Sequence, residues 1–228
     1  FQARRDDRSP QPLGAGQLVD GAGDALAGCA LAMVKSSIDF RNSTDLSSDR
    51  LLALCSQGLD GWSVGRITLR VRYSRGADFS GTCIYGSRRV YINLGRHLKY
   101  PYMMSSNLAK VHSTGRGWTR PLYSLELKNG YEVALFVFMH ELYHLLVKRA
   151  RRNTRQKESM CDRFAARHLI EQFQTSVWDE GGHPVPRELW DFQDIDGFVG
   201  AARQRLSQQR QRIVRANAAQ PRVSFVSG

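Results

Sequence analysis

The chain of 228 residues contains few cysteines, and they show no paired spacing. Cys29, Cys55, Cys83 and Cys161 lie far apart along the sequence. Zinc ribbons require cysteines in close pairs, and small disulfide-stabilised domains require a dense set of them. The pattern argues against both classes, and we expect reduced, buried thiols in a cytoplasmic protein.

Long hydrophobic runs are also missing. Residues 24–34 form an apolar stretch that is about half as long as the roughly 20 residues needed to span a bilayer. We interpret this stretch as a packing helix; a signal-peptide core is the alternative, which the acids and prolines ahead of it disfavour. Residues 1–20 predict a flexible tail because they lack hydrophobic periodicity. We therefore expect no membrane span, and the missing initiator methionine suggests a trimmed product.

Acidic residues are scarce relative to basic ones: 21 Asp and Glu stand against 33 Lys and Arg, which gives a net charge of +12. The excess is concentrated in residues 148–157 and in Arg203–Arg222, which contains no acid. The second segment predicts a basic helix with one weak apolar face. Such segments bind nucleic acid, an anionic surface or an acidic partner, and a solvated face that confers solubility is the alternative. No aromatic interleaving or base-reading motif accompanies the arginines, so any nucleic-acid contact is expected to be non-specific.

The length and the hydrophobic content of 42% suffice for one sizeable core. We place a single domain at residues 21–185 and a basic helical extension at residues 186–228. The order of the predicted elements within the domain indicates its fold class.

Five segments ahead of residue 130 carry strand or helix patterns. Ile67–Tyr73 alternates apolar and polar residues, which is typical of a half-buried strand. Thr82–Tyr85 and Val90–Leu94 flank a Gly-Ser turn and predict a hairpin. Leu122–Leu127 is a further extended run, and Ser47–Cys55 predicts a short helix. A small mixed sheet followed by helices defines an α+β fold.

The central motif lies in residues 131–146, which are apolar almost all round and predict a helix buried in the core. His140, Glu141 and His144 interrupt this run. Two histidines four residues apart share one helix face, about 6 Å apart along the axis, so both can bind one tetrahedral Zn²⁺. Zinc-bound water has a pKa near 7, and a neighbouring carboxylate can take its proton. The alternative is that both imidazoles only form hydrogen bonds inside the core.

A catalytic zinc site needs a third protein ligand and an open position for water. Residues 156–173 have helical periodicity, and Glu158 and Asp162 lie four apart on one face. One carboxylate could bind zinc while the other orients a ligand histidine through its second ring nitrogen. The alternatives are a solvated acid in the first turn for Glu158 and a surface pair with a neighbouring arginine for Asp162. Cys161 lies close enough to approach the metal, but burial as a small core residue is more typical of free cysteine.

These motifs resemble a known family. His140-Glu141-x-x-His144 followed by Glu158-x-x-x-Asp162 is similar to the gluzincin pattern of zinc metallopeptidases, and the run E-S-M-C-D-R-F-A-A-R-H-L resembles the second motif of the small ImmA/IrrE-type proteases. The resemblance implies a zincin-like fold in which His140, His144 and Glu158 bind zinc. It also implies that Glu141 is the general base and that Asp162 steadies a ligand histidine.

The resemblance implies a zinc-dependent endopeptidase that acts on a protein or peptide substrate. In zincins an edge strand binds the extended substrate, which makes Val90–Leu94 the candidate by resemblance; the alternative is an interior strand. The competing functional hypothesis is a non-enzymatic protein that binds nucleic acid or an acidic partner and contains a structural zinc.

Overall fold

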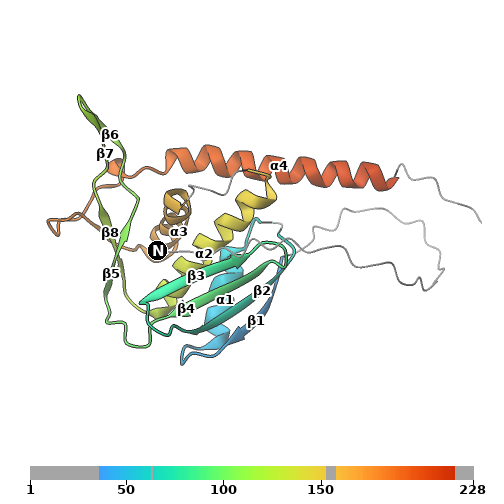
Figure 1. Ribbon diagram of the computed structural model, residues 1–228, viewed down its shortest axis with the longest axis horizontal. Helices are drawn as coiled ribbons and strands as arrows, with labels where there is room; N and C mark the ends of the chain where they lie inside the picture. Colours follow the sequence, from blue (N-terminus) through green and yellow to red (C-terminus); the bar gives the residue numbers. More distant parts are fainter. Residues whose placement is uncertain (1–35, 63, 153–157, 219–228) are drawn as a thin grey trace, which may run out of the picture.

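The computed structural model describes residues 36–62, 64–152 and 158–218 (Figure 1). The predicted tail at residues 1–20 and the predicted helix at residues 24–34 lie outside these ranges. Helices and a mixed sheet make up the described part. The α+β class predicted from the sequence is therefore confirmed.

The main sheet contains β1 (Ser37–Asn42), β2 (Arg66–Tyr73), β3 (Phe79–Ile84) and β4 (Arg89–Leu94) in the order β1-β2-β4-β3. The β1–β2 and β2–β4 pairs are parallel, whereas β3 and β4 form an antiparallel hairpin. The parallel crossover between β1 and β2 is made by α1 (Ser48–Gly58), the short helix expected from the sequence. The alternating residues on the inner face of the sheet are fully buried: Ile67, Leu69, Val71, Val90 and Ile92.

The hairpin is confirmed, but the sequence-based assignment of Val90–Leu94 as the edge strand is wrong. This segment forms β4, which pairs with β3 on one side and β2 on the other. The alternative, an interior strand, is the correct one, and among the described strands β3 and β1 lie at the two edges of the sheet. The error has a physical cause: a hairpin pattern specifies the partner across the turn, whereas the parallel partner on the far side depends on distant chain.

Helix α2 (Gly130–Arg149) runs across the sheet and is buried on every side (Figure 1). Every residue from Glu132 to Val147 is buried, because α2 contacts β3, β4, α1 and the following helix. The helix begins at a defined cap, where the side chain of Asn129 accepts hydrogen bonds from the backbone N–H groups of Tyr131 and Glu132. The all-round burial expected from the sequence is thus present.

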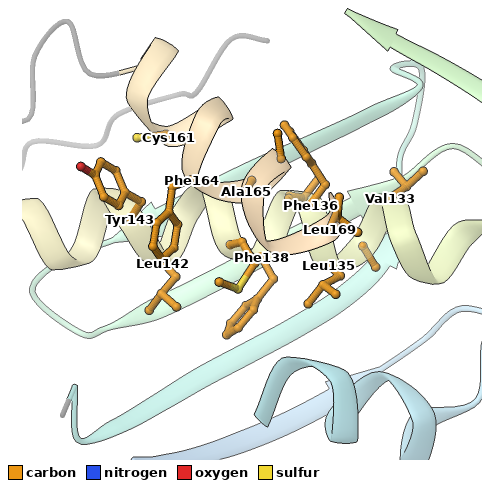
Figure 2. Packing of buried hydrophobic residues seen from close by; sticks show 14 of the residues in the cluster. Val133, Leu135, Phe136, Phe138, Leu142, Tyr143, Cys161, Phe164, Ala165 and Leu169 are labelled. Carbon is orange, nitrogen blue, oxygen red and sulfur yellow. The ribbon is translucent and has the colours of Figure 1, made fainter. Parts of the chain in front are cut away.

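Helix α3 (Glu158–Phe173) packs on the outer side of α2. Its buried face includes Ala165, whose small side chain lets the two helices approach closely. Figure 2 shows Tyr143 of α2 beside Phe164 of α3, and their ring centroids are 4.8 Å apart. This contact joins the second turn of α3 to the C-terminal half of α2.

A second, smaller sheet has the antiparallel order β5-β8-β9. It consists of β5 (Tyr102–Ser106), β8 (Tyr123–Leu127) and β9 (Val177–Trp178), and β8 confirms the extended run predicted just ahead of α2. Between β5 and β8 the chain forms an exposed hairpin of β6 (His112–Thr114) and β7 (Gly117–Thr119). The loop that leaves β5 leads towards α3.

The chain continues through a 3₁₀ turn at Arg187–Leu189 into the long helix α4 (Gln193–Ala218). This confirms the predicted terminal helix over residues 203–218 and shows that it begins ten residues earlier, whereas residues 219–222 of the prediction lie outside the described ranges. Ile195 and Ala202 are buried, so the first part of α4 belongs to the core, while most of the later side chains are exposed. No helix in the described ranges is both long and apolar enough to cross a membrane.

Candidate metal centre

The two motif histidines lie side by side in the most buried part of α2. His140 is 0% exposed and His144 is 1% exposed. Their Nε2 atoms are 3.2 Å apart, as expected for residues one helical turn apart on the same face. Two imidazole nitrogens at this distance repel one another unless a proton or a cation lies between them. The pair is therefore arranged to share a positive charge.

Glu158, the first residue of α3, completes a triangle with these nitrogens. Its Oε2 atom is 3.2 Å from Nε2 of His140 and 3.4 Å from Nε2 of His144. Tetrahedral coordination with bonds of about 2.0–2.1 Å places neighbouring ligand atoms about 3.3–3.4 Å apart. All three separations agree with this geometry, so the residues present fit a tetrahedral metal ion.

Cys161 is a further potential ligand next to this triangle. It is fully buried, and one ligand atom from each of His140, His144 and Cys161 can be chosen so that all lie within 4.8 Å of one another. This buried group could bind a metal ion. The carboxylate of Glu158 matches the tetrahedral spacing, because its distances to the two imidazoles are 3.2 and 3.4 Å.

Asp162 holds the outer side of His140. Its Oδ1 atom lies 2.9 Å from Nδ1 of His140, and its Oδ2 atom accepts a hydrogen bond from Nδ2 of Asn107 at 2.9 Å. A carboxylate at Nδ1 requires the ring proton there, which directs the lone pair of Nε2 towards Glu158. The sequence analysis predicted that one of the two acids, Glu158 or Asp162, would contact the second ring nitrogen of a motif histidine, and Asp162 makes this contact.

The two arginines considered as surface partners of Asp162 have partners elsewhere. The neighbouring Arg163 is buried, donates to the backbone oxygen of Asn107 at 2.8 Å and pairs with Asp191 at 3.3 Å. Arg167 pairs instead with Glu171. Arg163 thus anchors the loop that carries Asn107, and Asn107 in turn holds Asp162.

Sequence reasoning did not identify Asn107 or Arg163 as parts of this network. Asn107 follows β5, 55 residues before Asp162 in the sequence, and nothing in its local pattern indicates the contact. Arg163 resembles the other arginines of a basic chain, and its burial becomes evident only from the packing of α3.

The acids around the histidines favour positive charge at the centre. Burial lowers the pKa of His140, but its hydrogen bonds with Asp162 and Glu158 outweigh this effect and raise the pKa to about 9. The hydrogen bonds with His140 and His144 hold the pKa of Glu158 far below its ordinary value. The centre therefore attracts a cation.

Glu141 is 1% exposed and lies on the side of α2 that faces the edge strand β3. A Cβ atom added to Gly81 of β3 would be 2.4 Å from Oε1 of Glu141. The carboxylate therefore occupies the space that the missing side chain leaves. Sequence reasoning missed Gly81, although a glycine inside a strand often marks a close approach.

The centre opens to solvent on one side. The side chains of His140 and His144 are 0% and 2% exposed, whereas that of Glu158 is 39% exposed. The five site residues predicted from the motifs, His140, Glu141, His144, Glu158 and Asp162, lie on α2 and α3, and four of them are in direct contact. Glu141 is adjacent to His140 in the sequence and contributes to the raised pKa of that histidine.

Comparisons with protein-family models, curated proteins and solved structures found no match to this chain. The geometry of this centre and the chemistry of its donor atoms are therefore the basis for a proposed function.

Proposed function

We propose that the chain is a zinc-dependent metallopeptidase that hydrolyses peptide bonds of a protein substrate. The observation that carries the proposal is the triangle of Nε2 of His140, Nε2 of His144 and Oε2 of Glu158, with sides of 3.2–3.4 Å. Zn²⁺ bound there would polarise a carbonyl and lower the pKa of its water to about 7.

The protein side chains have distinct roles in this proposal. His140, His144 and Glu158 bind the metal, and Asp162 fixes the ring of His140 through Nδ1. Glu141 is the general base: it takes the proton of the attacking water and then delivers it to the departing amine. Its position against the edge strand β3 would bring this proton transfer close to a substrate bound along that strand.

A second candidate function is a binding protein with a structural metal. The observation that favours it is the buried Cys161, which lies near both imidazoles. Structural zinc sites are closed by four protein ligands and often include cysteine, whereas catalytic sites keep one position open. A site with three protein ligands would leave one position open for catalysis, whereas a fourth ligand from Cys161 would close the site.

Replacing Glu141 with glutamine tests the catalytic role. The parent, Glu141→Gln and the exposed control Glu180→Gln would each be incubated with a peptide library made from digested protein, and the new termini counted by mass spectrometry. We expect Glu141→Gln to keep its zinc and to lose at least about 100-fold in cleavage rate, the usual worth of a general base. The control should behave like the parent. Full cleavage by Glu141→Gln would refute the assignment of the base.

The ligand set is tested by the metal content of His140→Ala, Glu158→Ala and Cys161→Ser. A three-ligand site should lose zinc in the first two variants and keep it in the third. In the cobalt-substituted parent, the absence of a thiolate charge-transfer band is expected. Such a band, together with loss of zinc from Cys161→Ser, would favour the closed structural site.

A further inference from the structure

A basic groove lies away from the metal centre, between the end of α2 and the exposed part of α4. Its volume is about 730 Å³. Arginines and glutamines dominate its lining, and its apolar side chains are limited to Ala150, Ala201 and Ile213. The arginines are Arg149, Arg151, Arg152, Arg205 and Arg212.

A second groove, of about 450 Å³, lies on the other flank of α4. Arg149 lines both grooves, so the two join into one basic region. We define the arginine surface as the eight arginines that line the two grooves: Arg88, Arg149, Arg151, Arg152, Arg203, Arg205, Arg210 and Arg212.

Helix α4 arranges its share of these arginines in two rows. Arg203 and Arg210 face one groove, and Arg205 and Arg212 face the other. The members of each row are seven residues apart, which is about two helical turns or 10.5 Å along the axis. No acidic residue occurs from position 197 to the end of the sequence. Arg203, Arg205 and Arg212 are exposed and Arg210 is half-buried, and the C-terminal half of α4 extends beyond the end of α2 (Figure 1).

Three of these arginines contact aromatic rings or a backbone oxygen, which leave the positive charge of the guanidinium in place. The guanidinium of Arg203 lies over the ring of Trp62, 4.2 Å from its centroid, and Arg152 lies 5.5 Å from the ring centroid of Phe198. Arg149 donates to a backbone oxygen at 2.8 Å. Within the described ranges, no carboxylate lies within ion-pair distance of these three arginines, in contrast to Arg163 and Arg167 elsewhere in the chain.

The charges of the arginine surface also crowd one another. The pKa of Arg149 is lowered from its ordinary value by burial and further by the charge of Arg88. Like charges brought together cost free energy, which a bound anion would recover. The C-terminal dipole of α2 offsets only about half an elementary charge, which is small compared with the three charges of Arg149, Arg152 and Arg203.

We propose that the arginine surface binds the phosphate backbone of nucleic acid without reading its sequence. Arginine and glutamine side chains are typical phosphate donors. Protein partners need a core of apolar contact. The first groove offers little of it, and the apolar side chains of the second groove, Trp62, Leu206, Ile213 and Val214, lie among its arginines. The proposal concerns α4 and the end of α2, so it is independent of whether the metal centre is catalytic.

The test is fluorescence anisotropy of the full chain with a labelled 30-base-pair DNA duplex of mixed sequence between 50 and 300 mM NaCl. If four to eight phosphates are neutralised, log affinity should fall with log salt with a slope of roughly −4 to −7. The variant Arg205→Gln/Arg212→Gln removes two exposed arginines and should reduce the steepness of the slope by about 1.8. The control Arg41→Gln/Arg116→Gln removes the same charge from exposed positions on β1 and the β6–β7 hairpin and should keep the parental slope.

Adding Arg149→Gln and Arg203→Gln to the first pair should weaken binding at 100 mM NaCl more than about 100-fold. A thermal melt of each variant shows that it is folded. A flat salt dependence, or equal slopes for the two double variants, would overturn the proposal. Equal competition by polyglutamate of the same total charge would assign the surface to an acidic protein instead.

Discussion

At the residue scale, the glycine opposite Glu141 tests the proposed function as directly as the three proposed metal ligands do. Gly81 leaves space for the carboxylate, and a Cβ atom there would lie 2.4 Å from Oε1. We expect Gly81→Ala to displace Glu141 while the zinc content stays constant, since Glu141 is not a ligand. Displacement of about 1 Å can cost about 100-fold in rate, which the library cleavage assay would detect.

The matched control for this variant is Gly86→Ala, in the turn between β3 and β4, where an added Cβ meets nothing within 4 Å. It should cleave like the parent. If Gly81→Ala retained parental activity with an unchanged thermal midpoint, the carboxylate would have no role that depends on its position.

Asp162 provides a second prediction at this scale. Asp162→Asn keeps the shape of the side chain but removes the charge that orients His140, and it places an amide opposite the amide of Asn107. We expect zinc affinity to fall about 10- to 100-fold, measured by competition with a chromogenic chelator. The exposed control Asp60→Asn should bind zinc like the parent; an unchanged affinity in Asp162→Asn would mean that the carboxylate does not act on the metal.

The residues of the motifs were predictable because each motif lies within one helix. His140 and His144 are one turn apart on α2, and Glu158 and Asp162 are one turn apart on α3, so helical periodicity alone places each pair on one face. Gly81 and Asn107 were not predictable in this way. They reach the site through contacts between segments that are distant in sequence, which a local pattern does not encode.

At the scale of elements, α2 is the structural centre of the molecule because it carries the histidines and contacts both sheet and helices. Its start depends on Asn129, which caps two backbone N–H groups. We expect Asn129→Ala to reduce the free energy of unfolding by about 1–2 kcal/mol, while Asn129→Ser retains most of it. Urea unfolding monitored by circular dichroism measures both; equal stabilities of the two variants would contradict a capping role.

The sequence predicted individual helices and strands better than it predicted how the strands are ordered in the sheet. The buried pattern of α2, the β3–β4 hairpin and the extended β8 follow local periodicity. The order of strands in the main sheet does not, because β4 acquires its second neighbour through a parallel pair with β2. The start of α4 was placed too late because its first turns are less basic than Arg203–Arg222 and belong to the core.

At the scale of the whole molecule, a metal bound by α2 and α3 would add a further link between two helices that already interact by packing and through the contacts of His140 with Asp162 and Glu158. A ligand that binds only the folded state adds about 2.7 kcal/mol when its concentration is 100 times its dissociation constant. For a chain of this size that corresponds to a rise in Tm of roughly 5–10 °C. Differential scanning fluorimetry after chelation and after zinc addition would detect the rise.

His140→Ala is the control for this measurement, because it removes one ligand from the buried centre. Its Tm should not respond to zinc. A parental Tm that also fails to respond would show that α2 and α3 are not connected through a metal ion.

The unequal exposure of the three proposed ligands bears on how fast a metal ion is exchanged. The imidazoles are enclosed by the core, and the side chain of Glu158 is the part of the triangle that solvent reaches. An ion would enter and leave past this one carboxylate, by rotation of a single side chain and without unfolding of α2. Loading would then follow the free zinc concentration of the surroundings within the lifetime of the folded protein.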